Sequence, residues 1–193
     1  ITAGIEYFHP TIYQASLMLY YTEFVNHIAE YYINDISFGE AKYSYHNINN
    51  TYRGLEIRGK WKASSKLSAS WEINLIDNRY NDGTMIPNTQ PISVVNRLSY
   101  QAPKYPLGIS TNIKWTGPYT PSFHDIVTGN WVKEEKGRSG YTIFDISGHY
   151  TLKNYIKINC GIKNVSNFID HNYGPFIGRS FYFEISAHLM GRE

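Results

Sequence analysis

The sequence has no run of eighteen apolar residues, so it has no candidate for a transmembrane helix. It also has no glycine-rich phosphate loop and no His-Glu-x-x-His motif, and its only cysteine, Cys160, cannot form an internal disulfide. The net charge is only +2, so no strong electrostatic field indicates nucleic acid or an acidic partner. These absences leave few motifs that carry chemistry, and we expect neither catalysis nor a bound cofactor.

What the sequence does contain is a period-2 alternation of apolar and polar residues. This alternation is typical of strands whose two faces meet different environments. Nine candidate strands follow one another, at residues 1–9, 12–28, 43–63, 66–78, 92–102, 107–116, 141–152, 156–163 and 181–189. Many exceed the length of about five or six residues that is common in globular proteins, and long alternating strands favour a membrane barrel.

The expected connections alternate between short and long. Those after residues 9, 63, 102 and 152 are short, and those after residues 28, 78, 116 and 166 are long. The first long one is expected to be a polar, aromatic connection over residues 29–42. Outer-membrane barrels have short periplasmic turns and longer extracellular loops, and their aromatic girdles would explain the 18 tyrosines. The sequence therefore predicts an all-β fold, an antiparallel transmembrane β-barrel segment.

The alternation also predicts which side chains face lipid. The residues expected to point outward are Leu67, Trp71, Ile73, Ile109, Ile156, Ile158, Phe181 and Phe183. Cys160 shares the apolar side of its strand, so we expect an inert thiol facing lipid. On the opposite side, Arg58, Glu72 and Arg97 are expected to line the lumen.

Four short motifs carry a family resemblance. Gly54-Leu55-Glu56 is similar to a strand opening, and residues 140–145 are similar to a penultimate strand. Gly161-Ile162-Lys163-Asn164-Val165 resembles a strand end, and Gly178-Arg179 resembles the start of a last strand. In this order they resemble the carboxyl-terminal part of a TonB-dependent outer-membrane receptor.

That resemblance implies a segment of a 22-stranded barrel in the bacterial outer membrane. It implies uptake of a scarce nutrient, most often a ferric siderophore and sometimes haem, cobalamin or another chelate. The family's plug domain, through which the TonB system acts, precedes the barrel and is expected to be missing from residues 1–193, which we take to be one piece of a longer chain. Family members usually end on an aromatic residue, whereas here Leu189 is followed by four more residues.

The long loops carry the candidate binding residues. Loops held by a rigid scaffold commonly carry binding groups, and aromatic rings with a few charges can grip a metal chelate. The predicted ligand-binding residues are Tyr80, Asp82, Tyr119, His124 and Trp131. An ordinary exposed loop with interfacial aromatics is the alternative interpretation.

Other sites have weaker support. A metal site needs three or four converging ligands, whereas the seven histidines are scattered. Asp145 and Glu184 share a face with His149 and His188, so a carboxylate pair is conceivable, but the favoured interpretation is a wet barrel wall. Two other classes of protein stay open, a small structural or adhesive barrel without transport and a soluble ligand-binding β-sandwich.

Overall fold

The structure, a computed structural model, describes residues 1–35, 40–86, 88–124, 131–134, 137–152, 156–171 and 174–187. For residues 27, 29–35, 40–46, 123, 124 and 131 it describes the backbone alone. His188, Leu189 and the turn at 153–155 lie outside these ranges. Within the described ranges, no helix has the length and apolar character to cross a membrane.

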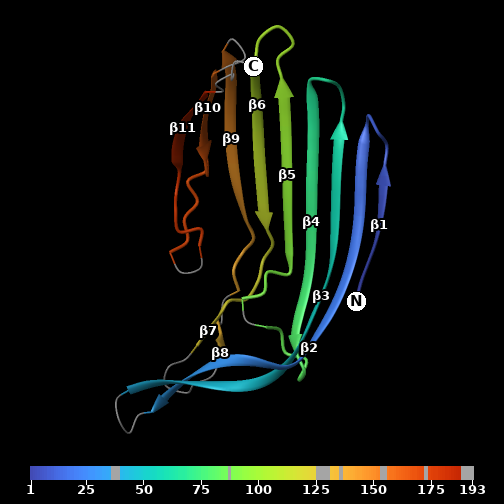
Figure 1. Cartoon of the computed structure of the whole chain (residues 1–193). Coiled ribbons are helices and arrows are strands. Elements are labelled where there is room, and N and C mark those ends of the chain that lie inside the picture. The colour runs from blue at the N-terminus through green and yellow to red at the C-terminus, as the bar shows by residue number, and fades with distance from the viewer. Residues whose placement is uncertain are drawn as a thin grey trace, which may run out of the picture.

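Nine antiparallel strands form one sheet in which neighbours in sequence are neighbours in space (Figure 1). The strands are β1 (Thr2–Phe8), β2 (Tyr13–Asp35), β3 (Glu40–Lys62), β4 (Leu67–Tyr80), β5 (Ile92–Gln101), β6 (Leu107–Thr116), β9 (Tyr141–Leu152), β10 (Ile156–Lys163) and β11 (Ser180–Ala187). The nine expected strands are all present. A sandwich would stack two sheets face to face, whereas these strands make a single layer.

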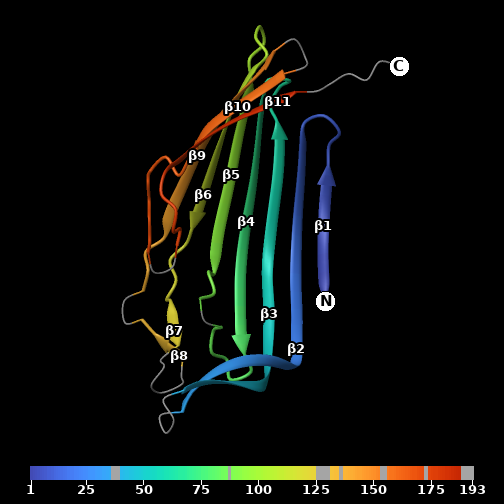
Figure 2. The same ribbon diagram turned by 60° about the vertical axis from the view of Figure 1, so that its left-hand side comes forward.

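The first long connection was predicted wrongly. Instead of a loop over residues 29–42, β2 and β3 continue as a paired ladder up to Asp35 and Glu40. The ladder shifts register between Phe24 and His27, where Asn26 adopts a left-handed φ of 57°. We call the hairpin beyond this bulge, residues 27–48, the arm. Because a bulge bends the strand that contains it, the arm turns out of the sheet and crosses its long-loop end (Figures 1 and 2).

The second difference lies in the loop at residues 117–140. It contains a small two-stranded ribbon, β7 (Ser122–His124) and β8 (Trp131–Lys133). The other long connections follow β4 and β10, and the short turns lie at the opposite end of the sheet (Figure 1). The predicted alternation of short and long connections is therefore confirmed, apart from the arm.

Strand pairing sorts the side chains onto two faces. Continuous register from β1 to β11 places all eight residues predicted to face lipid on the same face. Large apolar side chains stand exposed there, among them Phe181 at 73% and Phe183 at 67%. An exposed apolar surface of this extent indicates contact with a partner or with a membrane. We call this the outward face and the opposite, polar face the lumen face.

Strand glycines lie beneath rings on the neighbouring strand. Trp71 covers Gly59, Tyr20 covers Gly54, Tyr182 covers Gly161 and His149 covers Gly108, and each pair is directly opposite in register. A Cβ at any of these glycines would overlap the ring. Glycine weakens a strand because it has no side chain to pack, and a cross-strand ring replaces that missing contact. Gly54 of the family-like strand opening has this structural role.

The sheet is open within the described residues. β1 and β11 are its two edges and each pairs with one neighbour. Strand edges within lipid leave backbone groups without hydrogen bonds, so a membrane barrel has to close. A closed barrel of eight to ten strands is therefore not what this sheet forms.

Candidate ligand mouth at the long-loop end

Asn88 ties two long loops together. Its Nδ2 donates to the carbonyl of Ser122 at 3.1 Å, and its Oδ1 accepts from the Ser122 amide at 3.1 Å. Asn88 has a φ of 58°, a conformation that asparagine tolerates better than most residues. The loop after β4 also reaches the foot of the arm, because the Asn81 amide donates to the carbonyl of Asn49 at 3.2 Å. The arm and the loops after β4 and β6 are thus joined.

Arg138 and Tyr119 fix the other half of the 117–140 loop. Their backbones exchange hydrogen bonds of 3.2 and 2.8 Å, and Arg138 Nη1 donates to the Tyr119 hydroxyl at 3.1 Å. Arg138 also forms an ion pair with Asp170 of the loop after β10. Tyr119 is only 9% exposed. The predicted role of Tyr119 as a ligand contact stays a prediction, and its visible role is to anchor this loop.

Asn164 organises the last long loop. It is 5% exposed and has a left-handed φ of 51°. Its Nδ2 donates to the carbonyls of Phe168 and Ile177, its Oδ1 accepts from the Phe168 amide, and its own amide donates to Asp145 at 2.8 Å. Asn164, the asparagine of the family-like strand end, therefore holds the loop through several hydrogen bonds.

The two family-like motifs on either side of this loop, residues 161–165 and 178–179, are joined by hydrogen bonds. Arg179 Nε donates to the carbonyl of Val165 at 3.0 Å, and the Arg179 amide donates to Asn167 Oδ1 at 2.8 Å. Gly178 leaves room for this contact, because a Cβ there would overlap Asn167 and Ile169. Close approach of the Asn167 and Ile169 side chains thus explains why glycine precedes the arginine.

Aromatic rings gather on the lumen face beneath these loops. Phe24 and Tyr52 meet edge to face with centroids 5.3 Å apart, and Tyr141 stacks on Phe168 at 5.0 Å. The register places Tyr80 on the same face, next to Asn50 of β3. Sequence reasoning predicted Tyr80 as a ligand contact and did not propose Tyr52 or Tyr141, although strand alternation would have placed both on this face.

Asp82 closes the tight turn after β4. Its Oδ1 accepts from the Thr84 amide at 2.8 Å and from the Thr84 hydroxyl at 2.6 Å. These hydrogen bonds favour the charged carboxylate and lower the pKa of Asp82 below its usual range. Asp82 therefore holds a fully exposed negative charge at the rim.

Two other predicted residues meet in the small ribbon. His124 of β7 and Trp131 of β8 are direct register partners. Asp125, Glu135 and Lys136 of the same loop lie outside the described residues. The predicted residues therefore form separate groups, with Tyr80 and Asp82 at one turn and His124 and Trp131 on the ribbon.

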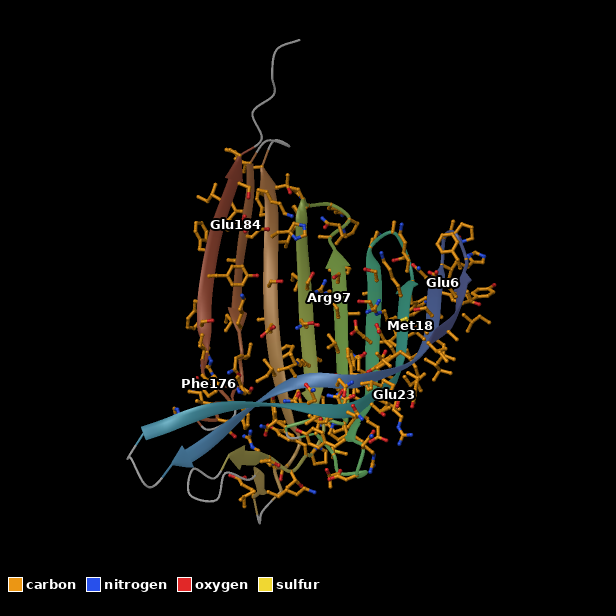
Figure 3. The ribbon with its side chains drawn as sticks, turned by 60° about the horizontal axis from the view of Figure 1, so that its bottom comes forward. Glu6, Met18, Glu23, Arg97, Phe176 and Glu184 are labelled. Carbon is orange, nitrogen blue, oxygen red and sulfur yellow. The ribbon has the colours of Figure 1, made fainter. Side chains whose placement is uncertain are left out.

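A polar hollow of about 510 Å³ lies further along the lumen face. The three residues predicted to line the lumen, Arg58, Glu72 and Arg97, all border it. Arg58 pairs with Glu56 and approaches Glu72 at 3.6 Å, while Arg97 has no ion-pair partner among the described residues. Figure 3 shows Arg97 on β5, with Glu6 and Glu184 toward opposite edges of the sheet.

The carboxylates of the polar face have amide partners. Asp145 accepts from Asn112 Nδ2 at 3.3 Å, and Glu184 accepts from Asn159 Nδ2 at 3.4 Å. No group of three histidine, cysteine or acidic side chains converges within the described ranges. Ordinary polar contacts therefore account for Asp145 and Glu184.

Comparison with known proteins gives the same architecture. Residues 1–165 match the family described as TonB dependent receptor-like, beta-barrel. The ferric enterobactin receptor PfeA of Pseudomonas aeruginosa, in a mutant complexed with enterobactin, is 21% identical with a TM-score of 0.77. The FrpB iron transporter of Neisseria meningitidis is 15% identical with a TM-score of 0.75, and the copper transporter OprC is 15% identical with a TM-score of 0.76.

Each of these three alignments covers 96% of this chain and 30% of the other chain. At such identities the likeness shows the fold alone. No curated protein sequence matches.

The long paired strands, the apolar outward face and the joined long loops define a wall of a transmembrane β-barrel. The chain belongs to the TonB-dependent receptor β-barrel family. Barrels of this family lie in the bacterial outer membrane, so the long loops face outside and the short turns face the periplasm.

Proposed function

We propose that this wall belongs to a receptor that takes up a metal chelate, with a ferric siderophore as the expected substrate, by TonB-dependent transport. The observation that carries the proposal is the joined set of long loops above the aromatic rings of the lumen face. Asn88, Arg138 and Asn164 hold those loops in place. A rigid rim lowers the ordering cost of binding a ligand.

The ligand would be held first by the loops and then by the lumen face. Tyr80, His124 and Trp131 are the proposed ligand contacts, with Asp82 at the rim. Tyr52 and Tyr141 are added from the lumen face, where rings can stack on an aromatic chelator. Below them, Arg97 has a guanidinium without an ion-pair partner among the described residues, and this group suits a carboxylate, a catecholate or another anionic donor.

The remaining partners follow from the family. Lipid would cover the outward face. Coupling to the TonB system would act through a plug domain within the lumen, because the described strands form wall only. Catalysis, nucleic acid and a resident cofactor have no role in this proposal.

The test uses the intact receptor in whole cells. Radiolabelled ferric siderophores of the catecholate and hydroxamate classes, together with haem and cobalamin, are measured for binding. For the ligand that binds, Tyr80→Ala with Trp131→Ala should weaken binding about tenfold or more, since truncating an important aromatic binding residue costs more than about 1 kcal/mol. The amount of receptor in the membrane should not change.

The matched control is Ser65→Ala in a periplasmic turn. Ser64 is unsuitable because its Oγ accepts from the amides of Lys66 and Leu67 at 3.1 Å and holds that turn. If the chelate binds equally well without the 117–140 loop, the role of that loop in binding is wrong, while the barrel assignment stands.

A further inference from the structure

Charged side chains occupy a single corner of the outward face. Between the short turns and the bulge at Asn26, the charged residues at outward strand positions are Glu23, Arg53, Asp77 and Arg79. Glu23 and Arg53 lie on β2 and β3 close to the bulge, and Asp77 and Arg79 lie near the long-loop end of β4. Glu23 is at the foot of the arm (Figure 3). Outside the arm, the other outward positions within the described strands carry uncharged residues. Such a local concentration calls for a specific explanation.

Asp77 orients two guanidinium groups side by side. Arg53 donates to Asp77 Oδ2 from Nε at 2.9 Å and from Nη2 at 2.6 Å. Arg79 donates from Nε to Asp77 Oδ1 at 2.8 Å and from Nη1 to the carbonyl of Gly83 at 2.8 Å. A guanidinium has five N–H donors, so each arginine keeps further donors available. The side chains of Arg53 and Arg79 are 52% and 43% exposed.

The cluster lies at the border of the apolar surface. The next outward residues toward the middle of the sheet are Leu55 and Leu75, two positions along the same strands. That spacing is about 7 Å along a strand. Tyr21, the register partner of Arg53, is 42% exposed and lies at the same level, as an interfacial aromatic does. The guanidinium groups therefore stand where the headgroups of the outer leaflet begin.

We propose that Arg53 and Arg79 bind a phosphate group of an anionic lipid in the outer leaflet. Two guanidinium forks fixed by one carboxylate match the several oxygens of a phosphate. The lipid's acyl chains would then run along Leu55 and Leu75. This inference depends on the barrel family and its orientation, and it does not depend on which ligand the receptor takes up.

The acidic residues set the character of the site. Asp77 is engaged by both arginines, and Glu23 lies in the row of Arg79 with Thr51 between them. The formal charge of the four residues sums to zero, so a diffuse positive field is not the source of recognition. Recognition comes from placed donors, and replacing arginine by lysine would remove the fork while keeping the charge.

The experiment uses the intact receptor in nanodiscs of three compositions. These are phosphatidylcholine alone, phosphatidylcholine with lipid A, and phosphatidylcholine with fully dephosphorylated lipid A. Retained lipid is measured by native mass spectrometry and affinity by displacement of a fluorescent lipid A. The wild-type receptor should retain lipid A. The double variant Arg53→Gln with Arg79→Gln should bind lipid A more weakly, by about tenfold or more, since charge-assisted hydrogen bonds are lost.

The control is Lys62→Gln with Lys66→Gln, which makes the same charge change at the short turn between β3 and β4, at the last residue of β3 and one residue before β4. Arg79→Lys should also lower the affinity for lipid A, and this single variant keeps the test decisive if the double arginine variant fails to assemble. Equal retention of dephosphorylated lipid A, or unchanged affinity in the arginine variants, would overturn the proposal. Displacement of lipid A by millimolar inorganic phosphate would show a free-anion site and would likewise overturn it. Chelate uptake is measured separately, so its failure would not be confused with failure of this site.

Discussion

Asn88 and Ser122 lie 34 positions apart in the sequence and exchange two hydrogen bonds of 3.1 Å through one amide side chain. Ser122 is only 6% exposed, so water does not readily replace these contacts. The loop after β4 and the loop after β6 are therefore tied to each other at this point. Binding groups on the two loops are held in fixed relation by a residue that need not touch the ligand.

Replacing Asn88 by glycine should loosen the rim. Glycine accepts the φ of 58° without strain, so the change isolates the loss of the amide group. Two buried backbone groups of Ser122 lose their partners, which costs about 1–3 kcal/mol for each group left unsatisfied. Limited proteolysis of the intact receptor should cut the 117–140 loop faster, and chelate affinity should fall.

Asn88→Asp serves as the comparison for that variant. Aspartate keeps the acceptor for the Ser122 amide and loses the donor to its carbonyl. Its effect should fall between wild type and Asn88→Gly. Equal proteolysis rates in all three proteins would show that the two loops are not coupled through this residue.

The contact between Arg138 and Tyr119 gives a second test of the rim. Tyr119→Phe keeps the buried ring and removes one hydrogen bond, which should cost about 1 kcal/mol. Tyr119→Ala removes the ring as well and should cost about 3–5 kcal/mol of local stability, as large buried rings do. We expect chelate binding to follow loop stability across the two variants, measured by hydrogen exchange of the 117–140 loop.

If Tyr119→Phe abolished binding while hydrogen exchange stayed at the wild-type rate, the hydroxyl would be a direct ligand contact. Tyr119 would then act as a binding residue and not as an anchor. An Asp170→Asn variant serves as the comparison. It removes the ion pair between Asp170 and Arg138 and leaves the contact between Arg138 and Tyr119 in place.

Two outward-face glycines should respond differently to the same substitution. A Cβ at Gly59 would overlap the Trp71 ring, whereas at Gly148 the nearest atom would be the Gly108 carbonyl at 3.7 Å, an ordinary contact. Gly59→Ala should therefore destabilise the barrel by about 1–3 kcal/mol, as overpacking does. Gly148→Ala should be neutral or slightly stabilising.

The midpoint of heat-induced unfolding of the intact receptor in detergent gels measures both glycine variants. If both lowered the midpoint equally, packing of Trp71 on Gly59 would not be the reason. Trp71→Ala in the Gly59→Ala background should relieve the clash, and this third variant separates overpacking from loss of backbone freedom.

Much of this fold could be predicted from the sequence because alternation is a local signal. Each of the nine strands has an apolar side facing lipid and a polar side facing the lumen, so a period of two is visible along the chain. The arm was missed for the same physical reason. Polar and aromatic residues follow one another in residues 29–42 without a period of two, so no strand signal is visible there.

The rim could be predicted only in part. Tyr80, His124 and Trp131 were predicted as ligand contacts because aromatic residues in long loops suit binding, and that role stays a prediction. The contacts of Asn88, Arg138 and Asp170 were missed because they join residues far apart in the sequence, and no local pattern reports such contacts. The family-like Asn164 and Gly178-Arg179 were visible as motifs in the sequence. Their hydrogen bonds to the carbonyls of Phe168 and Val165, which hold the last loop, are visible only in the structure.

Cys160 provides a built-in probe of the two faces. It is the single cysteine of the sequence, it is exposed, and its register partners are Gly148 and Phe183 on the outward face. In the intact receptor, with any cysteines outside this segment replaced, a lipid-soluble maleimide should label Cys160 and a charged maleimide should not. The reason is that lipid excludes the charged reagent from the apolar band.

The lumen-face control moves the thiol by one position. Asn159→Cys with Cys160→Ser changes which face carries the sulfur, because successive residues of a strand point to opposite faces. That variant should react with the charged reagent whenever the lumen is open to water. Labelling is read by mass spectrometry after membranes are washed, and detergent-solubilised receptor gives the fully accessible reference. Rapid reaction of Cys160 with the charged reagent in intact membranes, together with protection of the thiol in the Asn159→Cys variant, would reverse the faces and would contradict the assignment of the apolar side to lipid.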